Sequence, residues 1–182
     1  MVILITGGSG SGKSEYGEQL VMQLEPKQRI YAATMICRDE ESKKRVERHK
    51  RMRQGKHFQT VECPVDLEKL DLNLNPGETS TVLLECLSNL AANEMFRETG
   101  KRKDVEEAVM EGLFHLQKQV TNLMIITNEI FSDGEDYGRE TAEYQRILGS
   151  LKRRLAKMAD QVYEVVYGIP ICIKNSKKER LS

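Results

Sequence analysis

The chain has 182 residues, about the size of one domain and enough to bury a core without disulfide or metal staples. Its 28 Lys and Arg residues balance 28 Asp and Glu residues, which argues against binding to nucleic acid or membrane surfaces by bulk charge. A hydrophobic fraction of 39% argues against disorder, and the longest apolar runs are only strand-sized, so no membrane span is predicted.

The first third of the chain predicts two strand–helix pairs. Residues 2–6 are an apolar β-branched run, residues 7–12 are a Gly and Ser turn, and residues 13–24 have a helical composition. A second short strand is predicted at 29–33. The helix predicted over 39–53 begins at an aspartate, which is a favoured N-cap residue.

The middle of the chain continues this alternation. We expect a short strand at 59–61, a loop or short helical turn at 67–74 and an apolar strand at 81–84. Helices are predicted at 88–98 and 104–120, and in the second of these the apolar residues recur on one face.

The last third predicts a buried strand at 123–127 and a polar, acidic loop at 128–137. A helix with one apolar stripe follows over 138–159. Strands at 161–167 and 169–174 flank a tight turn.

The alternation as a whole predicts an α/β fold with a mostly parallel sheet and helices on both faces. Because the last two strands are joined by so short a turn, the C-terminal edge strand should be antiparallel. No linker interrupts residues 1–174, so we predict one domain, followed by a polar tail at 175–182.

A glycine-rich turn joins the first strand to the first helix. It fits the phosphate-binding pattern G-x-x-x-x-G-K-[ST] with Gly7, Gly8, Ser9, Gly10, Ser11, Gly12, Lys13 and Ser14. Lys13 would neutralise the β/γ-phosphate oxygens and Ser14 would ligate Mg²⁺. A flexible Gly/Ser turn is the alternative, but the strand–turn–helix context favours a P-loop NTPase-like nucleotide-binding domain.

A second metal ligand is expected at the end of another strand. The apolar run Thr81-Val-Leu-Leu-Glu85 ends in a carboxylate, which is the form of a Walker B strand. Because the carboxyl ends of parallel strands gather at one edge of the sheet, Glu85 can approach Ser14 there.

Residues 43–57 form a basic segment. Eight Lys or Arg residues, one acid, His49 and His57 occur in it. A solvated helix face explains most such charge runs. The alternative is a surface that neutralises polyphosphate and carries a histidine nucleophile, since a neutral imidazole can attack an α-phosphate.

The four cysteines, Cys37, Cys63, Cys86 and Cys172, are scattered and contain no CxxC pair. With no signal peptide visible at the N-terminus we expect reduced thiols in a cytoplasmic protein. A zinc site is a weaker alternative, since the histidines show no ligand spacing with the cysteines.

Motifs along nearly the whole chain resemble those of one family. They are Gly7-Gly-x-x-Ser11-Gly-Lys-Ser14, Tyr31-Ala-Ala-Thr34, Arg45-Val-x-x-His49-Lys50 with Arg53, Phe58-x-Thr60-x-Glu62, Leu83-Leu-Glu-Cys-Leu87 with Asn93, Thr127-Asn-Glu129, and Ala159-Asp160 with Gly168-Ile-Pro. In this order they resemble the bifunctional adenosylcobinamide kinase / adenosylcobinamide-phosphate guanylyltransferase family.

The resemblance implies a P-loop α/β homotrimer of cobalamin biosynthesis that uses GTP, ATP and Mg²⁺ on adenosylcobinamide and its phosphate. It implies that His49 receives GMP from GTP, with Lys13 as the other catalytic residue. The remaining nucleotide-binding positions that it implies are Thr34, Arg45, Lys50, Arg53, Glu62 and Glu85.

The chain also departs from the family pattern. Gly10 stands where the family usually has Arg, Gln54 where it has Pro, and Phe58 where Trp is commoner. Residues 130–137 are acidic where the family has a small apolar loop, and Lys152-Arg153 replaces an Asn-Gln pair. Two other functions are therefore kept as alternatives: a P-loop kinase of another small metabolite, and a non-catalytic nucleotide-binding regulatory module.

Overall fold

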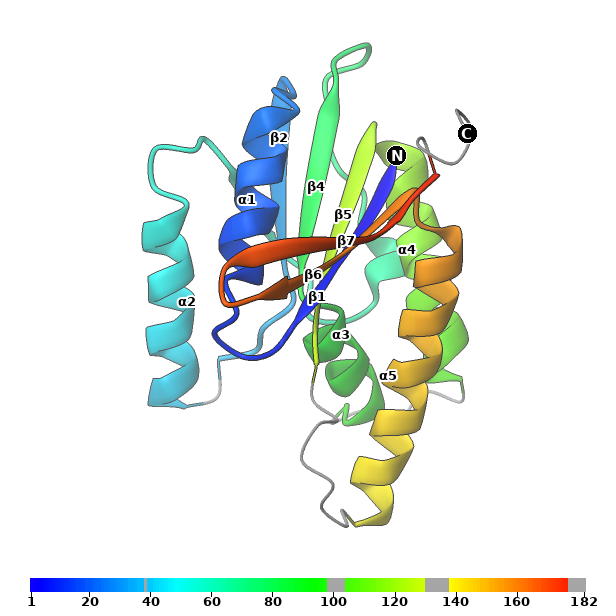
Figure 1. The fold of residues 1–182 in the computed structure, drawn as a ribbon. Helices are drawn as coiled ribbons and strands as arrows, with labels where there is room; N and C mark the ends of the chain where they lie inside the picture. Colours follow the sequence, from blue (N-terminus) through cyan, green and yellow to red (C-terminus); the bar gives the residue numbers. More distant parts are fainter. Residues whose placement is uncertain (38, 98–103, 130–137, 177–182) are drawn as a thin grey trace.

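One seven-stranded sheet organises the computed structural model, which describes residues 1–37, 39–97, 104–129 and 138–176 (Figure 1). The strands are β1 (Val2–Gly7), β2 (Gln28–Ala33), β3 (Gln59–Glu62), β4 (Ser80–Glu85), β5 (Asn122–Asn128), β6 (Gln161–Val166) and β7 (Ile169–Asn175). Their spatial order is β3-β2-β4-β5-β1-β6-β7. All neighbours are parallel except β6 and β7, so the predicted mostly parallel sheet with an antiparallel C-terminal edge is confirmed.

Helices cover both faces of this sheet (Figure 1). They are α1 (Lys13–Gln23), α2 (Glu40–Met52), α3 (Leu87–Met95), α4 (Val105–Gln119) and α5 (Arg139–Met158), with a short 3₁₀ helix, η1, at Leu67–Lys69. The helices α1 and α2 lie on one side, and α3, α4 and α5 lie on the other. None of the helices in the described ranges is both long and apolar enough to cross a membrane.

The core forms two layers because successive residues of each buried strand face opposite sides of the sheet. In β1, Val2 and Leu4 join the larger cluster under α3, α4 and α5. Ile3 and Ile5 join the smaller cluster, which also holds Val21 of α1. The strands are therefore apolar throughout, as expected of a parallel sheet that is buried on both faces.

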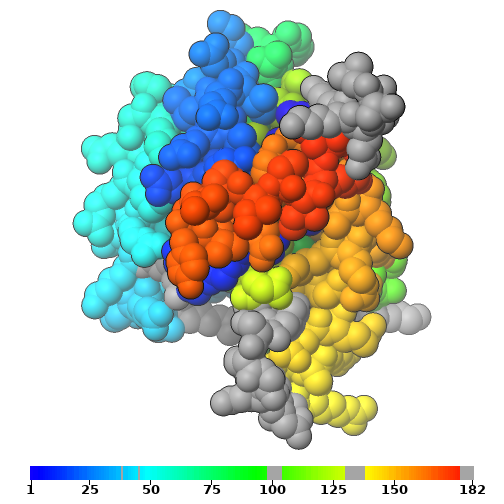
Figure 2. Space-filling view, in the orientation of Figure 1, coloured from blue at the N-terminus to red at the C-terminus, as the bar shows by residue number. Residues whose placement is uncertain are grey.

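The tip of the β6–β7 hairpin touches the turn between β1 and α1. The Gly168 N–H donates to the carbonyl oxygen of Ser11 at 2.8 Å. Gly12 adopts a left-handed conformation (φ +90°), and a Cβ on it would lie 3.2 Å from the Gly168 Cα. Figure 2 shows the orange and red hairpin crossing the front of the molecule beside the blue N-terminal residues.

Several element boundaries differ from the sequence-based prediction. The helix expected at 88–98 begins at Leu87 and ends at Met95, because Phe96 leaves the helical conformation (φ −108°, ψ 35°). The last strand extends past its predicted end at 174 to Asn175, because Asn175 pairs with Gln161. The predicted loop at 128–137 falls largely on residues outside the described ranges.

Candidate active site

The phosphate-binding turn lines a cavity of about 510 Å³ at the carboxyl edge of the sheet. Its residues Ser9–Ser14 form one wall, and residues from the ends of β4 and β5 and from α2 form the others. Lys13 is buried, and its ammonium donates to the Gly8 carbonyl oxygen at 2.9 Å. Consecutive backbone N–H groups and a buried ammonium at a helix N-terminus make this an anion-binding surface.

Ser14 and Glu85 are brought together as the sequence predicted. The Ser14 hydroxyl donates to Oε1 of the Glu85 carboxylate, across 71 residues of sequence. Glu85 is only 8% exposed and ends β4. A hydroxyl and a carboxylate oxygen beside a phosphate loop are hard ligands of the kind that Mg²⁺ prefers, so this pair fits the Mg²⁺ expected from the sequence.

The other oxygen of the Glu85 carboxylate leads to His49. Oε2 accepts a hydrogen bond from the Tyr31 hydroxyl at 2.9 Å, and the same hydroxyl oxygen lies 3.2 Å from Nδ1 of His49. His49 Nδ1 is also 3.5 Å from Glu85 Oε1. Burial, together with the nearby Glu85 carboxylate, raises the pKa of Tyr31, so its hydroxyl stays protonated at neutral pH.

The Tyr31 ring is held between two other side chains. The guanidinium carbon of Arg53 lies 3.4 Å from the ring centroid, which is a cation–π contact. Phe58 meets the ring edge-on, with the centroids 6.4 Å apart. The hydroxyl therefore has little freedom to leave Glu85 and His49.

A second cavity, of about 260 Å³, is also lined by His49. Its lining includes Ile36, Val46, Lys50, Arg53 and Glu62. Nη1 of the Arg53 guanidinium is buried and has no hydrogen-bond partner among the described residues.

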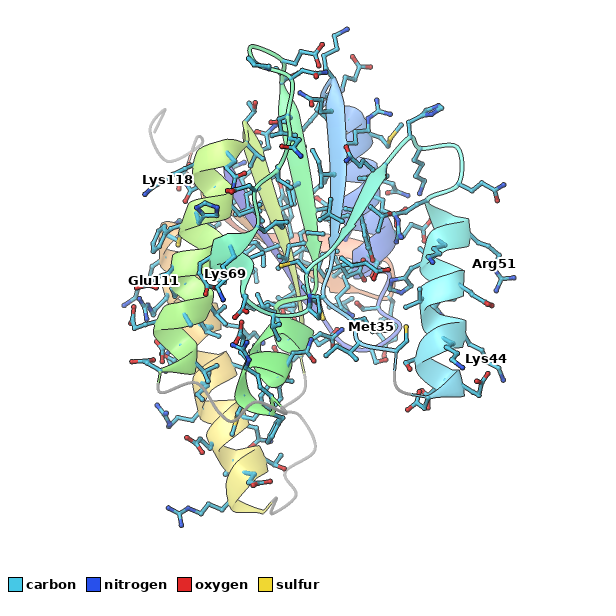
Figure 3. All side chains as sticks on the ribbon, turned by 180° about the vertical axis from the view of Figure 1, so that it is seen from behind. Met35, Lys44, Arg51, Lys69, Glu111 and Lys118 are labelled. Carbon is cyan, nitrogen blue, oxygen red and sulfur yellow. The ribbon has the colours of Figure 1, made fainter. Side chains whose placement is uncertain are left out.

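The two cavities share three residues, Met35, His49 and Glu85. In Figure 3, Met35 lies where the chain passes from the sheet to α2. A nucleotide bound with its phosphates on the turn would reach His49 from the first cavity. A group bound in the second cavity would reach the same residue.

A family model described as cobinamide kinase / cobinamide phosphate guanyltransferase matches residues 3–173. The chain belongs to this family. The bifunctional adenosylcobalamin biosynthesis protein CobU of Salmonella typhimurium is 32% identical over 186 residues, covering 96% of this chain and 100% of that protein. Its namesake in Escherichia coli is 33% identical over 189 residues, with the same coverage of 96% and 100%. As a member of this family, the protein is a kinase and guanylyltransferase of cobalamin biosynthesis.

Solved structures resemble the fold at low identity. A protein of Pyrococcus horikoshii OT3 matches with a TM-score of 0.52 and 9% identity, covering 98% of this chain and 88% of that one. An ATPase of a bacterial type III secretion system matches with a TM-score of 0.50 and 11% identity, covering 90% and 51%. These matches concern the fold alone, and they agree with a P-loop NTPase-like sheet.

The family positions predicted to bind nucleotide lie in different places. Lys50, Arg53 and Glu62 line the second cavity. Thr34 is fully buried and lines neither cavity, and its hydroxyl instead accepts from the Cys86 N–H and donates to the Cys86 carbonyl. The backbone of Arg45 is part of α2, but its side chain lies outside the described residues.

Sequence reasoning missed Tyr31 as a site residue, although it belongs to one of the family motifs. The signal was available, because a tyrosine hydroxyl inside an otherwise apolar strand needs a buried polar partner. It also missed Arg48, Asn89 and Glu129, which line the phosphate-loop cavity. Glu129 forms an ion pair with Lys152, and Lys152 is one of the positions where the chain departs from the family.

The basic segment divides into a solvated face and a site face. Lys44 and Arg51 point away from the sheet on the outer side of α2 (Figure 3). Lys56 instead reaches inward and pairs with the buried Glu18 of α1, with 2.6 Å between Nζ and Oε2. Burial raises the pKa of Glu18, and the Lys56 ammonium opposes this. The solvated-face interpretation is thus confirmed for Lys44 and Arg51, whereas Lys56 makes an internal ion pair, and the polyphosphate-neutralising surface stays a prediction.

His57 lies away from both cavities. It is exposed, has a positive φ of 56°, and lines a separate surface pocket with Lys27 and Arg29. It therefore offers a nearby control for His49.

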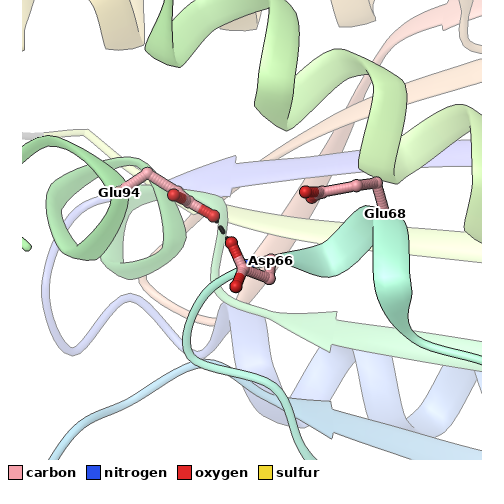
Figure 4. Close-up of side chains that lie close together, drawn as sticks. All are labelled: Asp66, Glu68 and Glu94. Carbon is pink, nitrogen blue, oxygen red and sulfur yellow. Dashed lines mark hydrogen bonds between the residues drawn. The ribbon is translucent and has the colours of Figure 1, made fainter. Parts of the chain in front are cut away.

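Cysteines form no metal-ligand cluster within the described ranges. One acidic group, Asp66, Glu68 and Glu94, has ligand atoms within 4.8 Å of one another (Figure 4). The Arg97 guanidinium already pairs with Asp66 at 2.9 Å and with Glu94 at 3.1 Å. We therefore treat this group as an ion-pair cluster that joins α3 to the segment before η1.

Proposed function

We propose that this protein phosphorylates the hydroxyl of adenosylcobinamide and then transfers GMP from GTP to the new phosphate through a covalent intermediate on His49. The observation that carries the proposal is the position of His49. It lies where the phosphate-loop cavity meets the second cavity, and it is joined through Tyr31 to the carboxylate that also contacts Ser14.

In the kinase step, the substrate hydroxyl attacks the γ-phosphorus of ATP or GTP and its proton is lost to solvent. The new phosphorus–oxygen bond forms as the bond from the γ-phosphorus to the β–γ bridging oxygen breaks, and the nucleoside diphosphate leaves with that electron pair. Lys13 and the backbone N–H groups of the turn stabilise the charge on the phosphate oxygens. Ser14 and Glu85 would hold Mg²⁺, which supplies further charge neutralisation when bound.

In the guanylyl step, an imidazole nitrogen of His49 attacks the α-phosphorus of GTP. The nitrogen–phosphorus bond forms, the bond to the bridging oxygen breaks, and pyrophosphate leaves with that electron pair. An oxygen of the adenosylcobinamide phosphate then attacks the same phosphorus. The electron pair of the nitrogen–phosphorus bond returns to the imidazole, and adenosylcobinamide-GDP is released.

The residues that line the second cavity support binding of the guanosine part of GTP there. Its Arg53 guanidinium has a buried donor that an oxygen of the nucleotide could satisfy, and the apolar side chains of Ile36 and Val46 suit a flat base.

The test is incubation with GTP labelled at the α-phosphate. We expect an acid-labile covalent label on the wild-type chain, no label on the His49→Asn variant, and an unchanged label on His57→Asn. Phosphorylation of adenosylcobinamide should continue in His49→Asn, because the substrate hydroxyl is the nucleophile there. Phosphoryl transfer without any label would leave only a kinase, and nucleotide binding without turnover would leave a regulatory module.

We also propose, from the family resemblance, a cytoplasmic homotrimer. Light scattering should then give about three times the chain mass of 20.8 kDa. A monomer at working concentration would contradict this part of the proposal and leave the catalytic assignment untouched.

A further inference from the structure

The histidine of the site has two ring nitrogens, and the position of its proton decides which one can attack phosphorus. In a neutral imidazole one nitrogen carries hydrogen and donates, while the other carries a lone pair. The nitrogen that donates cannot be the nucleophile. The neighbours of Nδ1 therefore determine the chemistry at Nε2.

The hydrogen bonds around Tyr31 fix this choice. An ionised carboxylate only accepts, so the single hydroxyl proton of Tyr31 is given to Oε2 of Glu85 at 2.9 Å. The hydroxyl oxygen is then an acceptor toward His49 Nδ1, which lies 3.2 Å away. Nδ1 also lies 3.5 Å from Glu85 Oε1, so the carboxylate charge favours a proton on that side of the ring.

A hydroxyl oxygen that accepts at this distance requires a proton on Nδ1. From this geometry we infer that Tyr31 is a positioning residue, which holds His49 in the Nδ1-protonated tautomer and so places the nucleophilic lone pair on Nε2. This inference rests on the proposed guanylyl transfer through His49. It adds an orienting role for a residue that supplies no atom to the reaction.

The surroundings of Tyr31 support a fixed position. Its ring is buried, lies against the Arg53 guanidinium on one face and meets Phe58 at its edge. Tyr31 belongs to β2, an interior strand of the sheet, where it pairs with Leu83 of β4 on one side and Thr60 of β3 on the other. The acceptor for Nδ1 is thus held by the sheet, while the histidine comes from the last turn of α2.

During guanylylation the proton on Nδ1 stays on the ring. The Nε2 lone pair forms the bond to the α-phosphorus, and pyrophosphate leaves with the electrons of the broken phosphorus–oxygen bond. The ring becomes positively charged, and the Glu85 carboxylate stabilises that charge through the Tyr31 hydroxyl. When the acceptor phosphate attacks, the electron pair returns to Nε2 and the tautomer is restored.

The direct test reads the tautomer by ¹⁵N nuclear magnetic resonance of the uniformly labelled chain. Only three histidines are present, and the His49→Asn variant identifies the His49 signals by their loss. At a pH where the ring is neutral we expect a protonated Nδ1 and an unprotonated Nε2 in the wild type. In Tyr31→Phe we expect the signals to move toward a mixture of both tautomers. A wild-type His49 protonated on Nε2 would overturn the inference.

The same variants are compared for the rate of covalent labelling. Tyr31→Phe should label about 10- to 100-fold more slowly, which is the usual loss when the partner that orients a functional histidine is removed. Tyr163→Phe is the matched control, because it also removes a tyrosine hydroxyl that donates one hydrogen bond, to Gln161 on β6. It should label at the wild-type rate.

The outcomes separate this inference from the proposed function. A wild-type chain that never acquires label refutes the guanylyl-histidine intermediate, while the resonance experiment still decides the tautomer. A labelled wild type with equal rates and unchanged tautomer in Tyr31→Phe refutes the role of Tyr31 and leaves the intermediate standing. Should Tyr31→Phe fail to fold, the wild-type spectrum alone decides.

Discussion

Glu85 connects the phosphate loop to the histidine with a single carboxylate. One oxygen accepts from Ser14 and the other accepts from Tyr31. A buried carboxylate is costly unless its oxygens are hydrogen-bonded, and here polar neighbours from α1, β2 and α2 surround it. If Glu85 holds the metal as proposed, one carboxylate would serve both the metal and the hydrogen bond to Tyr31 that leads to His49.

Replacement of Glu85 by glutamine tests its role at the metal. Glu85→Gln keeps the size of the side chain but removes its charge, so the Mg²⁺ concentration that gives half of the maximal kinase rate should rise about 10- to 100-fold. A Mg²⁺ titration of adenosylcobinamide phosphorylation measures this. Glu164→Gln on β6, outside both cavities, is the control, and an unchanged titration for Glu85→Gln would remove this residue from the metal site.

The four thiols should fall into two classes of reactivity. Cys37 and Cys172 are exposed, whereas Cys63 and Cys86 are buried. Burial raises the pKa of Cys63 and of Cys86 to about 11. At pH 8 a disulfide reagent should therefore titrate two thiols quickly in the native chain and four in denaturant. Rapid reaction of all four would show that the core around β4 opens.

The raised pKa values of these two buried thiols also determine how the stability of the fold changes with pH. Below about pH 8.5 the thiols are protonated in both the folded and the unfolded chain, so they make no pH-dependent contribution to the free energy of unfolding. Above it the unfolded chain loses protons that the folded chain keeps, so the free energy of unfolding falls as pH rises toward 11.

At the scale of the elements, two glycines in helices have opposite surroundings. A Cβ on Gly112 of α4 would lie 2.7 Å from the Leu67 Cβ and 3.0 Å from the Glu68 backbone nitrogen. A Cβ on Gly149 of α5 would meet only the tip of Arg153, at 3.5 Å. Close approach of α4 to η1 thus depends on the first glycine and not on the second.

Alanine substitutions should therefore act in opposite directions. Gly149→Ala should raise the free energy of unfolding by about 0.5–1 kcal/mol, because alanine favours the helix. Gly112→Ala should lower it by about 1–3 kcal/mol despite the same helix preference, because the packing against η1 must open. Urea denaturation of both variants measures this, and stabilisation by both would contradict the described packing.

Most of the elements could be predicted because their signals are local. The apolar run before Gly7 and the helix after Gly12 follow from composition, and the parallel sheet follows from the alternation of strands with helices. The Ser14–Glu85 contact was predictable because parallel strands end at one edge. The contact between Tyr31 and His49 was not, since it depends on how α2 sits beside β2, which no local pattern encodes. The burial of Thr34 was hidden for the same reason.

The exposure of the edge strand β7 could not be predicted either, for a different reason. Ile169, Ile171 and Ile173 of β7 have a strand's apolar alternation, and yet they are 65%, 49% and 59% exposed. The side chains of an edge strand are buried only where another element packs on them, and the described residues cover these three isoleucines only in part.

For the whole molecule, nucleotide binding should appear as thermal stabilisation. A ligand at about 100 times its dissociation constant adds about 2.7 kcal/mol, which corresponds to about 5–11 °C in Tm for a chain of this size. We expect such a shift with GTP and Mg²⁺ in a thermal scan. Lys13→Ala removes an ammonium from the phosphates and should weaken binding about 10- to 100-fold, so its shift at the same concentration should be much smaller. Equal shifts in both proteins would contradict the phosphate-loop assignment.

The contact between Gly168 and Ser11 has a consequence for how the protein is made. The phosphate loop is translated before the elements that support it: β5 lies on one side of β1, and β6 lies on the other. The hairpin tip that bonds to Ser11 of the loop is Gly168, and more than 150 residues separate the two. At about 5–20 residues per second the loop waits roughly 8 to 31 s for this contact. A growing chain therefore carries its nucleotide motif before the hairpin that bonds to it has been translated.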